Sequence, residues 1–277
     1  MYTVVKKEVL NPFVTRMDLE APFIARKARA GQFVILRVNE TGERIPLTIA
    51  AHDGAAGTVT IIFQKVGKTT LLLDTLNEGD AVLDLVGPLG RATEVAGHRR
   101  VAVIGGGVGC AIAWPEAKAF HEAGAHVDMI VGFRSRDIVM LEDECRAACD
   151  RLFVMTDDGT YGEKGFVTAK LQELMAAEEY DLVLAIGPLP MMRAVAALTE
   201  PAEIETMVSM NPIMIDGTGM CGGCRLTVGG EVKFACVDGP EFDAHKIDWD
   251  EAMKRLGQYK EREAACRLMF LEEQANG

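Results

Sequence analysis

No uninterrupted apolar segment of the 277-residue sequence reaches the roughly 18 residues of a membrane span, so a membrane-spanning protein is not expected. The first seven residues, MYTVVKK, lack the apolar core of a secretory signal peptide, which predicts a cytoplasmic protein. Basic residues are few, because 29 Lys and Arg face 41 Asp and Glu. The formal net charge of −12 argues against nucleic acid or an anionic membrane as the main partner.

A disulfide framework and a hydrolytic active site also lack support. The seven cysteines form an odd set in an acidic, cytoplasmic type of chain, which does not suit disulfide pairing. The five histidines are scattered, and neither a Ser–His–Asp set nor a carboxylate pair stands out, so no catalytic residue is predicted. The composition, 49% hydrophobic and 25% charged, is typical of a globular protein, and the length allows about two domains.

Four zones follow one another along the chain. Residues 1–98 contain short β-branched runs separated by turn residues, which predicts a small antiparallel barrel or sandwich. In residues 99–206 buried strands alternate with helices, the pattern of a parallel sheet covered on both faces. Residues 207–247 form a Gly- and Cys-rich module with a hairpin, and residues 248–277 predict one amphipathic helix.

A glycine-rich turn follows the first predicted strand of the parallel sheet. A strand that runs into glycines and then into a helix places backbone N–H groups where they hold a pyrophosphate, although a plain tight turn is the alternative. A second loop follows the strand 181–186 and lies at the same edge of the sheet. The predicted nucleotide-binding residues are Gly105, Gly106, Gly107, Val108 and Gly109 in the first loop, and Gly187, Pro188 and Met191 in the second.

A second ligand site is predicted in the barrel. The segment 44–48 combines an arginine, whose planar guanidinium pairs with phosphate, and a threonine hydroxyl suited to a ligand ring. The alternative is an edge strand with a surface arginine. The segment 67–70 enters a short helix and matches a phosphate-binding turn. The predicted residues are Arg44, Pro46, Leu47, Thr48, Gly67 and Thr70.

The spacing of three cysteines predicts a metal centre. Four residues separate Asp216 from Cys221, two separate Cys221 from Cys224, and eleven separate Cys224 from Cys236. Plant-type [2Fe–2S] sites use the first two of these spacings, with a cysteine in the first position and a fourth cysteine later in the chain. We therefore predict a [2Fe–2S] cluster with Asp216 as the fourth ligand. A zinc site and a set of plain reduced thiols are the alternatives.

These sites, in this order, resemble the ferredoxin-reductase-like flavoprotein family. The segment Arg44-x-Pro46-x-Thr48 resembles the FAD motif of this family, and residues 187–192 resemble its nicotinamide-side loop. One branch with a C-terminal [2Fe–2S] module includes the electron-transfer subunit of dihydroorotate dehydrogenase. It also includes the small subunit of NADH-dependent reduced ferredoxin:NADP⁺ oxidoreductase, an electron-bifurcating transhydrogenase. At Asp216 and residues 234–243 the sequence resembles this small subunit more than the dihydroorotate dehydrogenase subunit. The family's loop often begins with a cysteine, which Ile186 replaces here.

The resemblance implies an NAD(H)-dependent oxidoreductase subunit with FAD, NAD(H) and a [2Fe–2S] cluster. It implies that hydride passes between NAD(H) and FAD, and that single electrons pass through the cluster. The implied partner is a larger flavin and iron–sulfur subunit, which binds NADPH and reduces ferredoxin, in a heterodimer. The alternatives are the dihydroorotate dehydrogenase subunit and a non-catalytic, zinc-bearing subunit. At the adenosine end Arg134 and Arg136 favour a 2′-phosphate, Asp137, Asp157 and Asp158 oppose it, and the resemblance favours NAD.

Overall fold

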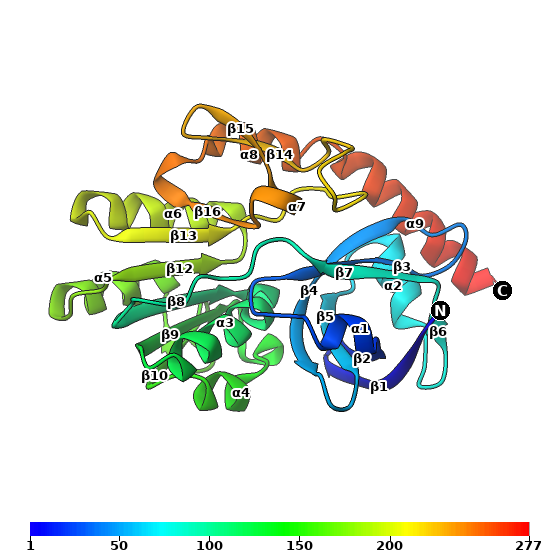
Figure 1. The fold of residues 1–277 in the computed structure, drawn as a ribbon, viewed down its shortest axis with the longest axis horizontal. Coiled ribbons are helices and arrows are strands. Elements are labelled where there is room, and N and C mark those ends of the chain that lie inside the picture. The colour runs from blue at the N-terminus through cyan, green and yellow to red at the C-terminus, as the bar shows by residue number, and fades with distance from the viewer. Residues whose placement is uncertain (277) are drawn as a thin grey trace.

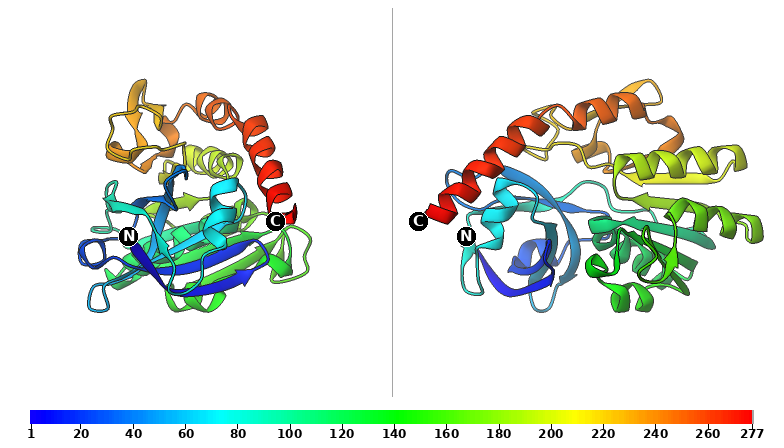
Figure 2. Two further views of the ribbon diagram at one scale, coloured as in Figure 1. Left: turned by 90° about the vertical axis from the view of Figure 1, so that its right-hand side faces the viewer. Right: turned by 180° about the vertical axis from the view of Figure 1, so that it is seen from behind.

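The computed structural model describes residues 1–276 and consists of two seven-stranded sheets that lie side by side (Figure 1). A third, smaller unit of one hairpin and short helices lies above them, and a long C-terminal helix runs from this unit past the first sheet (Figures 1 and 2). This order of an antiparallel sheet and then a parallel sheet confirms the predicted class of fold.

The first sheet is the antiparallel barrel, in the strand order β6-β1-β2-β5-β4-β3-β7. Its core consists of buried aliphatic residues that alternate with polar ones along the strands, such as Met17 and Leu19. The strands and helices are β1 (Tyr2–Asn11), β2 (Val14–Glu20), α1 (Pro22–Ala25), β3 (Phe33–Arg37), β4 (Arg44–Asp53), β5 (Thr58–Gln64), α2 (Lys68–Asp74), β6 (Ala81–Val82) and β7 (Asp84–Leu89).

The second sheet has the order β11-β10-β9-β8-β12-β13-β16 and is parallel except for β16. Helices α3 and α4 pack on one face, and α5 and α6 pack on the other, so the central strands are buried on both faces. The elements are β8 (Arg100–Gly106), α3 (Cys110–Glu122), β9 (His126–Phe133), α4 (Glu142–Ala147), β10 (Arg151–Thr156), β11 (Glu163–Lys164), α5 (Val167–Ala177), β12 (Leu182–Ile186), α6 (Leu189–Thr199) and β13 (Glu205–Ser209).

The third unit contains the predicted hairpin, formed by β14 (Arg225–Val228) and β15 (Glu231–Phe234) around Gly229 and Gly230. Helix α7 (Ala235–Asp238) follows, and β16 (Glu241–Asp243) then pairs with β13. The chain therefore returns to the parallel sheet after the hairpin. The expected boundary at residue 207 falls inside β13, whose apolar residues belong to the core of the sheet.

The prediction of one continuous C-terminal helix from residue 249 onward was wrong. Two helices form instead, α8 (Trp249–Leu256) and α9 (Lys260–Asn276), because the chain turns at Gly257. The apolar face expected along one amphipathic helix is therefore divided between α8 and α9. Trp249 packs against the core and Phe270 is buried, whereas Cys266 is exposed.

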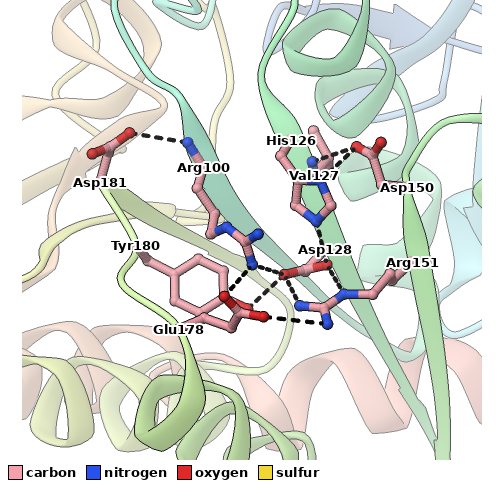
Figure 3. Close-up of polar contacts among 9 residues, drawn as sticks. All are labelled: Arg100, His126, Val127, Asp128, Asp150, Arg151, Glu178, Tyr180 and Asp181. Carbon is pink, nitrogen blue, oxygen red and sulfur yellow. Dashed lines mark hydrogen bonds and ion pairs between the residues drawn. The ribbon is translucent and has the colours of Figure 1, made fainter.

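A polar network joins the amino ends of neighbouring strands in the parallel sheet. Figure 3 shows Asp128 of β9 at its centre, with side chains from the starts of β8 and β10 directed toward it. Asp128 is completely buried, and its carboxylate accepts hydrogen bonds from Arg151 and from the Tyr180 hydroxyl, at 2.6 Å each. Because this edge lies opposite the carboxyl ends of the strands, the network stabilises the sheet away from its ligand-binding edge.

Candidate functional site

A cleft of about 1250 Å³ lies between the barrel and the carboxyl edge of the parallel sheet. It is lined by both domains and by the segment that follows β13, so three separate parts of the chain form its walls. Most predicted ligand-binding residues meet in this one cleft. They are Pro46, Leu47, Thr48, Thr70, Gly106, Gly107, Val108, Gly109, Arg134, Gly187, Pro188 and Met191.

The glycine-rich loop has the shape of a phosphate cradle. Gly107 has a φ of +55° and open space where a Cβ would point, while a Cβ on Gly109 would lie 2.4 Å from the Ile186 carbonyl oxygen. The loop leads into α3, whose first N–H groups have no partner within the helix. The geometry is compatible with a pyrophosphate at this helix N-terminus, and that site stays a prediction.

Three predicted residues, Arg44, Gly67 and Gly105, do not line the cleft. Arg44 is the first residue of β4, and its guanidinium lies 3.9 Å from a carboxylate oxygen of Asp84. Gly67 instead is the N-cap residue that precedes α2, and its N–H donates to the Thr70 hydroxyl at 3.1 Å. Gly105 allows close packing of β8 on α3, because a Cβ there would lie 2.9 Å from the Cα of Cys110.

Two parts of the cleft wall were not predicted from the sequence. The segment after β13, which includes Met210, Asn211 and Met214, forms one wall. Its position at the carboxyl end of a parallel strand is a signal that could have identified it. Phe166, which precedes α5, also lines the cleft although its side chain is 67% exposed, and no sequence pattern distinguishes it from other loop aromatics.

The two arginines expected at the adenosine end differ in position. Arg134 lines the cleft together with Asp157, which follows the neighbouring strand β10. The guanidinium of Arg136 instead lies 5.7 Å from the centre of the Tyr161 ring. One cationic and one anionic side chain therefore contribute to this end of the cleft.

The four predicted cluster ligands lie in two adjacent pairs. Both carboxylate oxygens of Asp216 accept backbone N–H groups of its own loop, from Thr218 and Cys221 at 2.7 Å each. In the second pair the backbone N–H of Cys236 donates to the Cys224 sulfur at 3.5 Å. Two ligands for each iron is the arrangement that a [2Fe–2S] cluster requires.

The chemistry of these ligands also fits a cationic group. The backbone N–H groups of Thr218 and then Cys221 hold the pKa of Asp216 below its usual range, so this carboxyl is anionic at neutral pH. Burial, followed by the adjacent Cys224 thiol, raises the pKa of Cys236 to about 12. A bound cation would relieve this penalty, because metal binding deprotonates a thiol. Within residues 1–276 no three His, Cys, Asp or Glu side chains surround one common metal position.

The loop that carries these ligands packs on the barrel beside the cleft. Gly217 has a φ of +76°, and a Cβ on it would lie 2.6 Å from a methyl group of Leu89 and 2.8 Å from Ile35. Met214 at the start of the loop lines the cleft, whereas Cys221 is exposed on the outer surface. The loop therefore connects the cleft wall to the molecular surface.

Solved structures with the same architecture define the class of this protein. The ferredoxin reductase of carbazole 1,9a-dioxygenase is 20% identical, with a TM-score of 0.63 over 73% of this chain and 65% of that one. The cytochrome P450 reductase of Amycolatopsis is 22% identical, with a TM-score of 0.61 over 73% of this chain and 66% of that one. The chain thus has the ferredoxin-reductase-like fold, and this confirms the fold predicted from its sequence.

Closer relatives include the C-terminal module. Residues 211–248 match the iron-sulfur cluster binding domain of dihydroorotate dehydrogenase B. The electron transfer subunit homolog of dihydroorotate dehydrogenase B from Thermotoga maritima is 44% identical over 97% of this chain and 95% of its own length. The corresponding subunit from Bacillus velezensis is 34% identical over 84% of this chain and 93% of its own length. A chain in the structure of NADH-dependent reduced ferredoxin-NADP oxidoreductase, studied for flavin-based electron bifurcation, is 43% identical, with a TM-score of 0.93 and 98% of both chains covered.

The chain belongs to the family of dihydroorotate dehydrogenase B electron-transfer subunits and their homologues. It is an oxidoreductase subunit with an iron–sulfur binding domain and an electron-transfer role, which confirms the predicted class of function. Across residues 1–276 no helix combines the length and apolar character that crossing a membrane requires.

Proposed function

We propose that this protein is a cytoplasmic electron-transfer subunit that exchanges hydride between NAD(H) and FAD and passes single electrons through a [2Fe–2S] cluster. The observation that carries the proposal is the continuity of the segment 211–224. Asn211, Pro212 and Met214 in its first part line the cleft, and its last part includes the proposed ligands Cys221 and Cys224. A single short loop thus connects a dinucleotide-sized cleft with the proposed cluster site.

In this proposal the chain's residues bind and orient the cofactors. Thr48 and Thr70 of the barrel contact FAD, and the N–H groups of the loop 106–109 hold the NAD(H) pyrophosphate. Asp216, Cys221, Cys224 and Cys236 hold the cluster. Bound nicotinamide and flavin supply hydride chemistry, and the cluster supplies single-electron chemistry. Ile186 lines the cleft where the family's loop often has a cysteine, so this position offers no thiol.

The proposed partner is a larger flavin and iron–sulfur subunit that binds NADPH and reduces ferredoxin. Support comes from the full-length similarity to a chain of the NADH-dependent reduced ferredoxin-NADP oxidoreductase. Cys221, one of the proposed cluster ligands, is exposed, which supports the approach of a partner at this surface. The electron-transfer subunit of an NAD-dependent dihydroorotate dehydrogenase remains the second candidate, since relatives with that name match most of the chain.

Spectroscopy of the purified full-length chain tests the cofactors. The expected result is flavin absorbance, about two iron atoms per chain and a [2Fe–2S] EPR signal after reduction with NADH. A colourless protein that contains zinc would overturn the proposal.

Purification from the native source tests the partner. NADPH-dependent ferredoxin reduction by the purified complex supports the first candidate partner, and dihydroorotate oxidation supports the second.

A further inference from the structure

The turn that carries two of the proposed cluster ligands, residues 221–224, receives hydrogen bonds from two arginines. Arg225 is the first residue of β14, and its Nη1 donates to the carbonyl oxygen of Gly222 at 3.1 Å. Arg255 belongs to α8, and its Nη2 donates to the carbonyl oxygen of Gly223 at 3.1 Å. Two consecutive carbonyl groups of this ligand turn are therefore bound by guanidinium groups that come from separate elements.

One of these carbonyl groups belongs to a peptide group whose N–H faces a ligand sulfur. The Gly222 carbonyl and the Gly223 N–H form one peptide group, which is trans, so its C=O and N–H bonds point in opposite directions. The Gly223 N–H donates to the Cys221 sulfur at 3.4 Å. Arg225, which binds the oxygen on the opposite side, therefore fixes the orientation of the N–H that bonds this sulfur. It also polarises the peptide group, which strengthens the N–H as a donor.

Helix α8, which carries Arg255, is attached to the hairpin that follows the ligand turn (Figure 1). The Glu251 carboxylate accepts the N–H of Thr227 at 3.0 Å, and the N–H of Asp248 donates to the Thr227 carbonyl oxygen at 2.9 Å. Arg255 is partly buried and follows Glu251 by four residues, so both side chains lie on the same face of α8. The guanidinium of Arg255 therefore reaches the ligand turn from a helix that other hydrogen bonds hold in place.

The charge of these two arginines is not neutralised by a neighbouring carboxylate. No ion pair found within residues 1–276 includes Arg225 or Arg255, and the ion pairs of the C-terminal module join other residues. The proposed ligand set consists of Asp216 and three thiolates, all of them anionic. Each electron that such a centre accepts adds negative charge, so positive charge beside the ligand turn favours the reduced state.

We propose that Arg225 and Arg255 are positioning residues of the [2Fe–2S] site, which fix the carbonyl groups of the ligand turn and raise the reduction potential of the bound cluster. This inference rests on the proposed function, because it requires that the chain binds the cluster. Removing either guanidinium frees a carbonyl group of the turn and removes a positive charge, and both changes disfavour the added electron. Helix α8 thus contributes to the cluster site through Arg255.

Redox titration of the full-length protein with its cofactors bound, followed by EPR, tests this inference. R225M and R255M are each expected to lower the reduction potential. At the wild-type midpoint the ratio of reduced to oxidised cluster should fall on the order of tenfold, which corresponds to about 59 mV for one electron. R225K and R255K keep a positive charge and an N–H donor, so both should recover most of the wild-type potential.

The matched control is K233M. Lys233 lies in the same hairpin, and its Nζ donates to Glu231 at 2.7 Å instead of to the ligand turn, so K233M removes one positive charge without freeing a carbonyl group of the turn. K233M should therefore keep the wild-type potential. A shift in K233M as large as in R225M would overturn the positioning role, because net charge alone would then set the potential.

Equal potentials in wild type, R225M and R255M would overturn the inference and leave the proposed function intact, since the cluster would still be present. A wild-type protein without iron or a [2Fe–2S] signal would overturn both, so the two failures are distinguishable. Arg225 is exposed, and its substitution removes no side chain from the core. R225M therefore tests the inference even where R255M does not fold.

Discussion

Arg151 donates two hydrogen bonds to the buried carboxylate of Asp128, from Nε to Oδ1 and from Nη2 to Oδ2, each 2.6 Å long. The Tyr180 hydroxyl donates to the same carboxylate, and Arg100 and His126 lie within 3.6 Å and 3.2 Å of it (Figure 3). The pairing fastens β9 to β10 where both strands begin. It contributes to the rigidity of the sheet whose opposite edge forms the cleft.

Asp128→Asn is expected to destabilise the protein by about 3 kcal/mol, because the variant leaves the Arg151 guanidinium without its bidentate partner. Chemical unfolding monitored by circular dichroism measures this change. The matched control is Asp250→Asn, which breaks an exposed ion pair with Arg193 and should cost less than about 1 kcal/mol. Equal losses in the two variants would show that the buried network contributes no more than a surface pair.

The carboxylate of Asp128 also predicts that the free energy of unfolding decreases in acid. Burial alone would raise the pKa of Asp128, but the hydrogen bonds from Arg151 and Tyr180 outweigh burial and hold the pKa below its usual range. Because the folded pKa is lower than the unfolded value of about 3.9, this stabilisation is complete above about pH 4 and is lost as pH falls through the folded pKa. Unfolding measured from pH 6 downward should therefore show a smaller acid loss in Asp128→Asn than in wild type. Parallel pH profiles would contradict this prediction.

Asp216→Ala is expected to lower the iron content or to change the EPR spectrum of the reduced cluster, since a carboxylate is a harder ligand than a thiolate. The matched control is Asp238→Ala in the same module, whose carboxylate also accepts a backbone N–H, from Phe234 at 2.7 Å. Iron analysis and EPR of both variants distinguish the loss of a cluster ligand from the loss of a hydrogen bond that stabilises the loop. An unchanged signal in Asp216→Ala would remove this residue from the ligand set.

Wild-type protein is expected to show a lower KM for NADH than for NADPH in a diaphorase assay, because Asp157 at the adenosine end repels a 2′-phosphate. Asp157→Asn should raise kcat/KM for NADPH about tenfold, which corresponds to about 1.4 kcal/mol of removed repulsion. Asp158→Asn is the control, since Asp158 does not line the cleft and its carboxylate accepts from Thr160 instead. The same gain in both variants would contradict a specific role for Asp157.

Much of the architecture could be predicted because its determinants are local. The buried run Val101 to Ile104 followed by glycines is sufficient to indicate a strand, a turn and a helix of a parallel sheet. The break between α8 and α9 at Gly257 was missed, because the apolar spacing continues across it while the backbone does not. Hydrophobic periodicity describes which face a residue would occupy, not whether the helix continues.

The candidate site was only partly predictable, for a related reason. Thr48, Gly107 and Met191 could be predicted one motif at a time, and the structure shows that they share one cleft. Arg44 matches the same motif by sequence, yet its guanidinium lies 3.9 Å from an oxygen of Asp84 in β7, and the sheet brings the two together because β3 pairs with both β4 and β7. Asn211 and Met214 belong to no motif and line the cleft through the position of β13.

The sequence by itself determined the order of the domains, the glycine-rich turn after β8 and the spacing of Asp216 and the three cysteines, since each depends on residues close together in the chain. Only the tertiary structure buried Glu116 completely, although its local sequence resembles that of a surface glutamate. Only packing removes such side chains from water. The burial that raises the pKa of Glu116 is therefore a property of the fold and not of the residue.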